Sequence, residues 1–276
     1  MKKDIRIIAL DLDGTLLNSN KELTERNYRA LEAAAAKGIQ IVPTTGRFYD
    51  GMPQMIRDLP FVNYAITING AHVHNVHTGE VLYRAEIPWQ QALELLEFLD
   101  TLPVVYDCYL DNGAFMTAAM QDSIEHYTDN PHYRKMVRDL RKPVPELKGF
   151  VAERRQDVQK SQFFTMDGEL RRRMLEELPR RFPCTIVSSA LEHNVEINNE
   201  HANKGAAVLA LAEHLGCGAE HVMSFGDGLN DLTMIEAAGM GVVMDNGADE
   251  LKRCADYITD DCDHDGVAAA IEKFCL

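Results

Sequence analysis

Acidic side chains follow two short apolar runs of this 276-residue sequence, in a spacing that suits phosphoryl transfer. Asp11-Leu12-Asp13-Gly14-Thr15 comes directly after the apolar run Ile5–Leu10, and Gly226-Asp227-Gly228-Leu229-Asn230-Asp231 comes after Val222–Phe225. A carboxylate can attack phosphorus and form an aspartyl-phosphate. A second carboxylate two residues further on can protonate the leaving oxygen and later deprotonate water. The sequence therefore predicts two catalytic carboxylates, Asp11 and Asp13.

Four carboxylates in one site require a cation, because like charges that lie close together cannot all ionise. Hard oxygen ligands suit Mg²⁺, which binds few protein groups and keeps sites for substrate phosphate. Lys204 and Thr45 add an ammonium and a hydroxyl that can hold phosphoryl oxygens as charge develops. Gly14 and Gly46 let backbone N–H groups approach a phosphate closely.

The elements that must position these residues alternate between strand and helix. Ile5–Leu10, Ile39–Pro43 and Tyr64–Ile68 are short apolar runs that predict buried strands. Thr24–Lys37 has helical character and ends before a glycine. This rhythm predicts a parallel α/β sheet of Rossmann type. The carboxyl ends of such strands share one edge, where ligands bind, so distant loops can meet there.

The rhythm changes in the middle of the chain, where we expect an inserted domain. Val73–His77 and Val81–Ala85 predict a β-hairpin, and mixed helices and strands follow. Residues 84–191 hold 15 Lys and Arg against 17 Asp and Glu, whereas the rest of the chain holds 13 against 26. We therefore predict an α+β cap over 84–191 and a strongly acidic α/β core formed by 1–83 and 192–276.

Four motifs in this order resemble those of the haloacid dehalogenase superfamily of phosphatases. The motifs are Asp11-x-Asp13-Gly14-Thr15, Thr45-Gly46-Arg47, Asn203-Lys204-Gly205 and Gly226-Asp227-x-x-Asn230-Asp231. The long insert between the second and third motifs is similar to the α+β cap of the Cof-type branch. Asn69-Gly70-Ala71 and Asp265-Gly266-Val267 also look like that branch.

The resemblance implies a role for each motif residue. Asp11 would be the nucleophile and a metal ligand, and Asp13 would be the general acid/base with its backbone carbonyl on the metal. Asp227 would be a third ligand, and Asp231 would hold a metal-bound water or orient Lys204. The implied phosphate-binding groups are Leu12 N–H, Thr45, Gly46 N–H, Lys204 and Asn230, and the candidate substrate contacts are Arg47 and Asn69.

One departure from the family pattern concerns Met244-Asp245-Asn246-Gly247. The family more often has Gly at the position of Asp245 and Ala at that of Gly247. We expect the extra carboxylate of Asp245 to affect a local contact with the substrate but not the reaction itself.

The leading hypothesis is a Mg²⁺-dependent phosphatase of small phosphorylated metabolites such as sugar phosphates. A phosphomutase would use the same aspartyl-phosphate but return the phosphoryl group to the substrate. A phospho-acceptor signalling domain also pairs acids with Thr and Lys, but its acceptor follows a middle strand and it has no cap.

Composition excludes several other classes of protein. A net charge of −15 disfavours nucleic acid and anionic lipid as partners. No stretch approaches the roughly 20 apolar residues that span a membrane. Six scattered cysteines fit a reducing compartment, so we expect a cytoplasmic protein.

Three further groups of residues invite a functional role that we weigh against a structural one. His72, His74 and His77 are predicted to lie on the solvated face of the hairpin rather than on a metal. Asp261-x-Asp263-x-Asp265-Gly266 with Glu272 matches a calcium loop, but a strand precedes it and too few residues follow, so we expect acidic groups at the start of the last helix. In the cap, Trp89, Tyr106 and Tyr109 are expected in the apolar core rather than at a cleft.

Overall fold

The protein divides into two compact units. The computed structural model describes residues 4–189 and 193–276. The core unit comprises the chain up to Arg47, Met52–Arg84 and Asn203–Leu276, and the cap unit comprises Phe48–Gly51 and Ala85–Ala202. The first expected division, after residue 83, lies one residue before the observed one. The second, between 191 and 192, falls outside the described residues, and the structure divides the chain after Ala202 instead.

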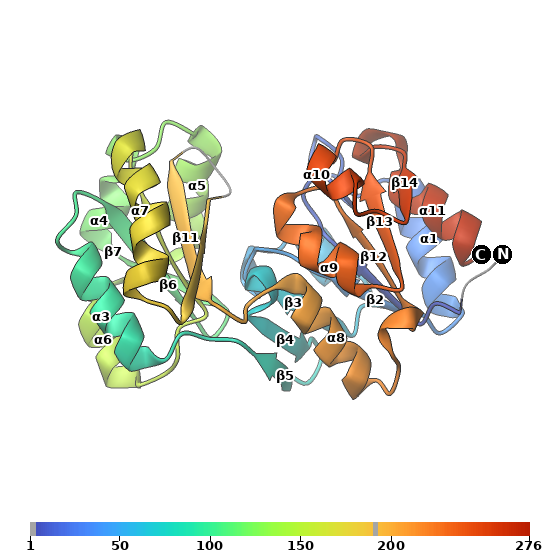
Figure 1. The fold of residues 1–276 in the computed structure, drawn as a ribbon, viewed down its shortest axis with the longest axis horizontal. Coiled ribbons are helices and arrows are strands. Elements are labelled where there is room, and N and C mark those ends of the chain that lie inside the picture. Colours follow the sequence, from blue (N-terminus) through green and yellow to red (C-terminus); the bar gives the residue numbers. More distant parts are fainter. Residues whose placement is uncertain (1–3, 190–192) are drawn as a thin grey trace. The chain divides into compact units, whose positions relative to one another are not determined.

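The core unit is built on a parallel five-stranded sheet in the order β14-β13-β12-β1-β2 (Figure 1). Its strands are β1 (Ile7–Leu10), β2 (Gln40–Pro43), β12 (Val222–Gly226), β13 (Met240–Met244) and β14 (Tyr257–Thr259). All four residues of β1 are buried. A strand buried along its whole length is typical of parallel sheets, because crossover helices cover both faces. The predicted parallel α/β fold is confirmed.

Helices connect these strands, and the one predicted over Thr24–Lys37 is found within one residue of those bounds at each end. They are α1 (Glu25–Ala36), α2 (Gln54–Arg57), α8 (Lys204–His214), α9 (Leu232–Ala237), α10 (Asp249–Lys252) and α11 (Gly266–Phe274). The Thr24 hydroxyl accepts a hydrogen bond from the Asn27 backbone N–H at the start of α1, and Asn203 caps α8 in the same way through Ala206. Such caps satisfy backbone donors that a helix leaves unpaired at its first turn. Figure 1 shows α1 beside α11.

A small antiparallel sheet adjoins β2. It contains β3 (Tyr64–Thr67), β4 (His72–Asn75) and β5 (Val81–Arg84), so the predicted hairpin is confirmed. The third predicted parallel strand, β3, is joined to the β2 region by isolated parallel bridges. The expectation of solvated histidines is wrong for His72 and His74, which are 4% and 5% exposed, with their ring centroids 5.2 Å apart. His77 is exposed, as predicted.

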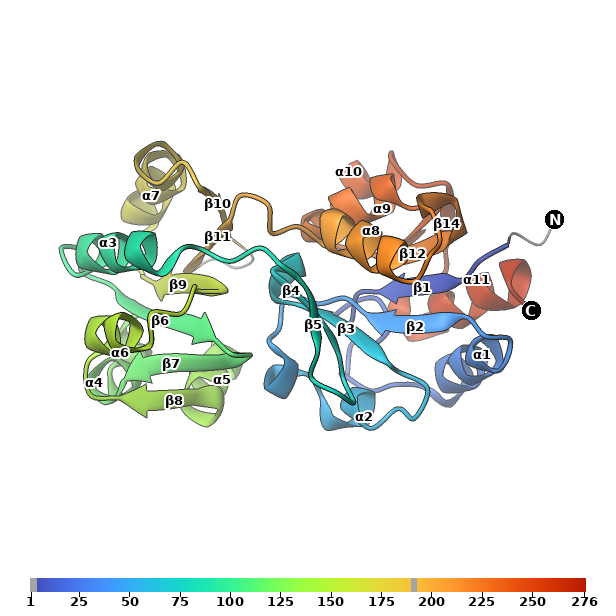
Figure 2. The same cartoon turned by 90° about the horizontal axis from the view of Figure 1, so that it is seen from below.

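The cap unit has a six-stranded sheet in the order β10-β11-β9-β6-β7-β8, which Figure 2 shows from the side. Its strands are β6 (Val105–Leu110), β7 (Gly113–Thr117), β8 (Arg141–Val144), β9 (Lys160–Phe164), β10 (Thr185–Ser188) and β11 (Asn194–Asn199). Strand β11 pairs with β9 and β10, which explains why the cap extends past residue 191.

Helices α3 (Trp89–Leu99), α6 (Leu147–Arg154) and α7 (Gly168–Arg181) pack on one face of the cap sheet, where Tyr106 is in the apolar core and Trp89 packs against it, as predicted. The expectation of an apolar environment is wrong for Tyr109, which is buried but bonded to Arg141 and Gln162. Helices α4 (Ala118–Asp122) and α5 (Pro131–Leu140) cover part of the other face. Among residues 4–189 and 193–276, no helix is both long and apolar enough to cross a membrane.

Candidate active site

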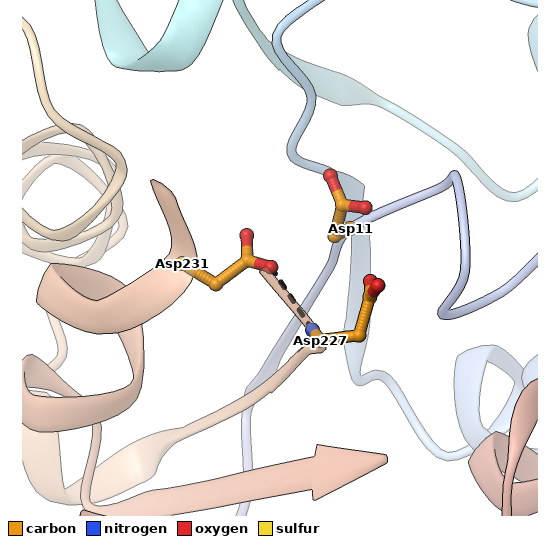
Figure 3. Close-up of side chains that lie close together, drawn as sticks. All are labelled: Asp11, Asp227 and Asp231. Atoms are coloured by element: carbon orange, nitrogen blue, oxygen red, sulfur yellow. Dashed lines mark hydrogen bonds between the residues drawn. The ribbon is translucent and has the colours of Figure 1, made fainter. Parts of the chain in front are cut away.

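Three carboxylates meet at the carboxyl edge of the core sheet. Asp11 follows β1, Asp227 follows its neighbour β12, and Asp231 ends the short 3₁₀ turn Leu229–Asp231. One oxygen of each lies within 4.8 Å of the others, and Figure 3 shows the three side chains converging. The chain places β2 on one side of β1 and β12 on the other, which is the point where ligands bind in open parallel sheets. We call these carboxylates, with Lys204, the core carboxylate cluster.

Lys204 lies between two of these carboxylates. Its Nζ donates to Asp11 Oδ1 at 2.6 Å and to Asp231 Oδ1 at 2.5 Å, and the residue is fully buried. Burial acts to lower the pKa of Lys204, but the two carboxylates outweigh it and hold that pKa above its ordinary value. Lys204 is therefore a fixed positive charge at the first turn of α8.

Asp231 uses both of its oxygens in contacts with the protein. While Oδ1 accepts from Lys204, Oδ2 accepts from the backbone N–H groups of Asp227 and Gly228 at 3.0 Å each. The dashed line in Figure 3 marks one of these bonds. These contacts favour the role of orienting Lys204 over direct metal ligation, the two alternatives that the sequence leaves open.

The surroundings of Asp11 and Asp227 suit these two carboxylates as ligands of a cation. Burial raises the pKa of Asp11 to about 7, against the opposing attraction of Lys204 and with the repulsion of Asp231 adding to it. Burial likewise raises the pKa of Asp227 to about 6, although a hydrogen bond from Thr15 opposes the rise. One ammonium does not balance three carboxylates, so the donor set fits a divalent cation with oxygen ligands.

Gly14 and Thr15 set the position of Asp227. The Thr15 hydroxyl donates to Asp227 Oδ1 at 2.7 Å and is completely buried. Gly14 has φ +89°, and a Cβ there would lie 2.5 Å from Asp227 Oδ2, so no other residue fits without a shift. The positioning role of Thr15 is absent from the sequence analysis, although its place in the first motif is a signal for it.

Asp13 lies outside the cluster and is paired with cations. Arg47 Nε donates to its Oδ2 at 2.7 Å and Nη2 to its Oδ1 at 2.9 Å, while Lys21 Nζ lies 3.1 Å from Oδ1. Burial acts to raise the pKa of Asp13, but these cations outweigh it and hold that pKa below its ordinary value. Arg47 thus contacts the candidate acid/base, a contact that the sequence analysis does not foresee. The contact of Lys21 with Asp13 is not foreseen either, because Lys21 lies in none of the motifs.

Three of the five candidate phosphate-binding residues, Thr45, Gly46 and Asn230, lie next to Asn69. The Thr45 backbone carbonyl accepts from the Asn69 N–H at 3.1 Å, and Asn230 Nδ2 donates to Asn69 Oδ1 at 3.4 Å. A Cβ on Gly46 would lie 2.8 Å from the same Asn69 oxygen. Leu12, whose N–H is expected to bind phosphate, is the buried residue between Asp11 and Asp13.

The backbone that carries Asn69 is strained. Ile68 and Asn69 both have φ 55°, a left-handed conformation that is unusual for a β-branched residue. Gly70, at φ +92°, comes so close to the start of α8 that a Cβ would lie 2.2 Å from the Asn203 carbonyl oxygen. Such strain clusters at functional sites, where the surrounding structure holds it. Here it ties Asn69 to the helix that carries Lys204.

The residues that depart from the family pattern lie at the rim of this region. Asn246 Nδ2 donates to the Gly14 carbonyl at 2.8 Å, and its Oδ1 accepts from the Cys262 N–H at 2.9 Å. Asp245 pairs with Lys252 at 3.4 Å. The extra carboxylate is therefore paired with a cation from the last residue of the following helix, α10.

In the acidic segment near the carboxyl terminus, a strand (β14) precedes the motif as predicted and α11 begins at Gly266, although Asp265 makes no side-chain cap bond to that helix. Asp261 accepts from the backbone of Asp263 and His264, whereas Asp263 accepts from Ser19 and Asp265 from the Thr24 hydroxyl. Glu272 pairs with Arg26. Each of these carboxylates therefore has a partner within the protein.

Comparisons with known proteins agree with this arrangement. Residues 8–271 match the family described as haloacid dehalogenase-like hydrolase. The putative phosphatase YxeH of Bacillus subtilis (strain 168) is 35% identical, with 98% of each chain covered.

Two further proteins are similar over nearly their whole length. The 5-amino-6-(5-phospho-D-ribitylamino)uracil phosphatase YcsE of Bacillus subtilis (strain 168) is 30% identical over 99% of this chain and 97% of its own. A crystal structure of a haloacid dehalogenase-like hydrolase from Bacteroides thetaiotaomicron has a TM-score of 0.84 and 27% identity, with 98% of this chain and 99% of that chain covered.

Proposed function

Because this chain belongs to the haloacid dehalogenase-like hydrolases, we propose that it is a Mg²⁺-dependent phosphatase of small phosphorylated metabolites. The observation that carries the proposal is the core carboxylate cluster, in which Lys204 is clamped between Asp11 and Asp231 beside Asp227. A carboxylate held against a buried ammonium at the edge of a parallel sheet is placed to meet a phosphoryl group.

The residues that would hold the metal are Asp11 and Asp227, with the backbone carbonyl of Asp13 as the resemblance implies. Their raised pKa values and converging oxygens support this assignment. When bound, Mg²⁺ would neutralise phosphoryl charge and orient the substrate. Asp231 contributes by fixing Lys204.

The proposed reaction has two steps. A carboxylate oxygen of Asp11 attacks phosphorus, the ester P–O bond breaks, and the leaving oxygen takes a proton from Asp13. A water then gives a proton to Asp13 and attacks the aspartyl-phosphate, so that inorganic phosphate leaves and Asp11 is regenerated. Lys204, Thr45, Asn230 and the N–H groups of Leu12 and Gly46 would bind the phosphoryl oxygens.

Asp13 must leave its present ion pair to act as an acid. The two bonds from Arg47 occupy both of its oxygens and favour the ionised form. We propose that substrate binding draws Arg47 away, which agrees with its assignment as a candidate substrate contact.

The proposed substrates are small phosphorylated metabolites, with sugar phosphates as the first class to test. The similar phosphatase YcsE is named for a substrate with a phosphorylated ribityl chain. We propose that the cap selects among such substrates and contributes none of the chemical groups, because all four motifs lie in the core unit.

A screen of phosphorylated metabolites for released inorganic phosphate, with Mg²⁺, tests the function. We expect release that is absent in the Asp11→Asn variant. An isomerised product without free phosphate would instead identify a phosphomutase. A stable phosphoprotein without turnover would identify a phospho-acceptor domain, and no reaction with any substrate would refute all three.

A further inference from the structure

We propose that six buried polar side chains of the cap bind a neutral, hydroxylated part of the substrate. This group, the cap polar cluster, consists of Asp107, Tyr109, Arg141, Lys160, Gln162 and Glu196. The inference rests on the proposed function, because it names the chemistry of the substrate that the core dephosphorylates.

The cap polar cluster occupies one face of the cap sheet. Alternate residues of β6 point to opposite faces, so Asp107 and Tyr109 lie opposite to Tyr106 and Cys108, which pack in the helix-covered apolar core. In the strand register, Asp107 pairs with Gln162, Gln162 with Glu196, and Tyr109 with Lys160. The row from β6 through β9 to β11 spans roughly 10 Å, because neighbouring strands lie about 4.8 Å apart.

Ion pairs and hydrogen bonds connect the members. Asp107 Oδ2 accepts from Arg141 Nε at 2.8 Å and from Gln162 Nε2 at 3.0 Å. The Tyr109 hydroxyl is bonded to Arg141 Nη2 at 2.8 Å and to Gln162 Nε2 at 3.1 Å. Lys160 Nζ donates to a Glu196 oxygen at 3.2 Å. Every member is at least nine-tenths buried.

Packing does not explain these charges. The neighbouring part of the same sheet face carries Val105, Met116 and Phe164, which pack with Ile124 and Val137 as an ordinary apolar cluster. Buried ion pairs are often no more stabilising than apolar residues of similar size, because desolvation offsets their attraction. Apolar packing alone therefore does not account for the two ion pairs, and ligand binding is the role that we infer for them.

Two atoms of the cluster identify what that ligand offers. Among the described residues, Asp107 Oδ1 and Arg141 Nη1 are buried without a hydrogen-bond partner, although both belong to the same ion pair. They are one acceptor and one donor. A hydroxyl group can donate a hydrogen bond to Asp107 Oδ1 or accept one from Arg141 Nη1. A ligand with several hydroxyl groups can follow the row of side chains across three strands.

The charge balance of the cluster disfavours an anionic ligand group. Two carboxylates face one guanidinium and one ammonium, so the cluster carries no net charge. A second phosphate or a carboxylate would approach Asp107, and a cationic group would approach Arg141. The balance therefore favours the neutral part of a monophosphate over a bisphosphate.

Space for a ligand and a link to the core accompany the cluster. A cavity of about 250 Å³ in the cap is lined by neighbours of the cluster, among them Tyr133, Phe164 and Asn194, and not by the six members themselves. Asn194 Nδ2 lies 3.5 Å from the Glu196 oxygen and so connects the cavity wall to the cluster. The ring of Phe48 packs edge-on against Tyr109 at 5.4 Å. Phe48 directly follows Arg47 in the chain, so a single peptide bond joins the second catalytic motif to a residue that contacts the cluster.

Steady-state kinetics of the full-length protein test the inference. We measure kcat/KM for sorbitol 6-phosphate, glucose 6-phosphate, fructose 1,6-bisphosphate and p-nitrophenyl phosphate. We expect the wild type to favour the better of the two hydroxylated monophosphates over the bisphosphate by about tenfold or more, because the bisphosphate brings an uncompensated charge to Asp107. The open-chain and ring probes distinguish a polyol from a sugar.

Variants then identify the residues responsible. Asp107→Asn should lower the ratio of kcat/KM for the preferred monophosphate to that for p-nitrophenyl phosphate by about tenfold, because a charged acceptor is lost. Tyr109→Phe removes one hydroxyl and should lower the same ratio by a smaller factor, which provides a test if Asp107→Asn does not fold. Cys108→Ala, on the opposite face of β6, is the matched control and should leave the ratio unchanged.

The outcomes separate this inference from the proposed function. If the wild type hydrolyses p-nitrophenyl phosphate but the ratio is unchanged in Asp107→Asn and Tyr109→Phe, or if the bisphosphate is preferred, the inference is wrong and the phosphatase stands. If nothing is hydrolysed, the proposed function fails, and calorimetric titration with sorbitol 6-phosphate and glucose 6-phosphate decides the inference. Binding that weakens about tenfold in Asp107→Asn supports it, and no binding to either probe overturns it.

Discussion

The two buried charge clusters of this protein differ in balance and in position. The core carboxylate cluster sets three carboxylates against the single ammonium of Lys204 and lies where strands end. The cap polar cluster sets two carboxylates against two cations and lies within strands. An unbalanced cluster requires a cation from outside, whereas a balanced one is complete in charge and can discriminate by hydrogen bonding.

The position of each cluster fits its proposed use. Loops after β1 and β12 can surround a phosphoryl group and a metal from several directions, because their backbone is free of sheet hydrogen bonds. Side chains within β6 and β9 are fixed by the strand register and present a rigid row. The following predictions test the contrast between the two clusters, from the largest expected effect to the smallest.

Replacing Asp11 with Asn should remove turnover, by about 10⁴-fold or more, because the amide keeps the shape but cannot attack phosphorus. The rate of p-nitrophenyl phosphate hydrolysis measures the loss, and circular dichroism confirms the fold. Substantial residual activity would show that Asp11 is not the nucleophile.

Removal of divalent cations should lower activity by about 10³-fold or more, because the core carboxylate cluster is unbalanced without one. Activity should return with Mg²⁺ and be inhibited by excess Ca²⁺, which prefers more ligands at longer distances. The assay compares chelator, Mg²⁺ and Ca²⁺ at constant ionic strength. Full activity in chelator would contradict the metal assignment.

Lys204→Ala should lower kcat by about 10²- to 10³-fold, because a fixed donor to the phosphoryl oxygens is lost. Complete burial of Lys204 between two carboxylates also predicts a loss of stability in chelator, and added Mg²⁺ should restore part of it. Thermal unfolding with and without Mg²⁺ measures that rescue. A variant that unfolds but keeps its activity per folded molecule would make Lys204 structural.

Lys160→Met should destabilise the cap by about 3–5 kcal/mol, because it leaves Glu196 buried without its cation. The double variant Lys160→Met with Glu196→Leu should recover most of that loss, whereas Mg²⁺ should recover none. Urea unfolding of the three proteins provides the comparison. Recovery of stability on addition of Mg²⁺ would contradict the proposal that only the core carboxylate cluster needs a cation.

The stability of the metal-free protein should depend on pH through Asp11. Its pKa is about 7 in the folded protein, against an ordinary value of 3.8 for an aspartate exposed to water, so between these values the folded protein holds a proton that the unfolded chain has released. Stability relative to Asp11→Asn should therefore fall as pH rises from about 4 to about 7, by about 1–3 kcal/mol. Urea unfolding in chelator measures the stability of the wild type relative to Asp11→Asn. An increase of this relative stability with pH would contradict the raised pKa of Asp11.

Local sequence patterns determined the parallel sheet and the catalytic motifs. Strands β1, β2 and β12 appear as short apolar runs, and each motif sits beside a strand end or a helix start that its own residues define, as Thr24 and Asn203 do by capping α1 and α8. Because parallel strands share one carboxyl edge, the gathering of Asp11, Lys204 and Asp227 follows from order along the chain alone.

Only the tertiary structure decided which partners the polar side chains have. Arg47 on Asp13, Thr15 on Asp227 and the burial of His72 depend on contacts between segments far apart in the sequence, which no local period encodes. The cap polar cluster is the extreme case. Its members come from four strands, and Asp107 meets Arg141 and Gln162 only because strand pairing and side-chain alternation bring them to one face.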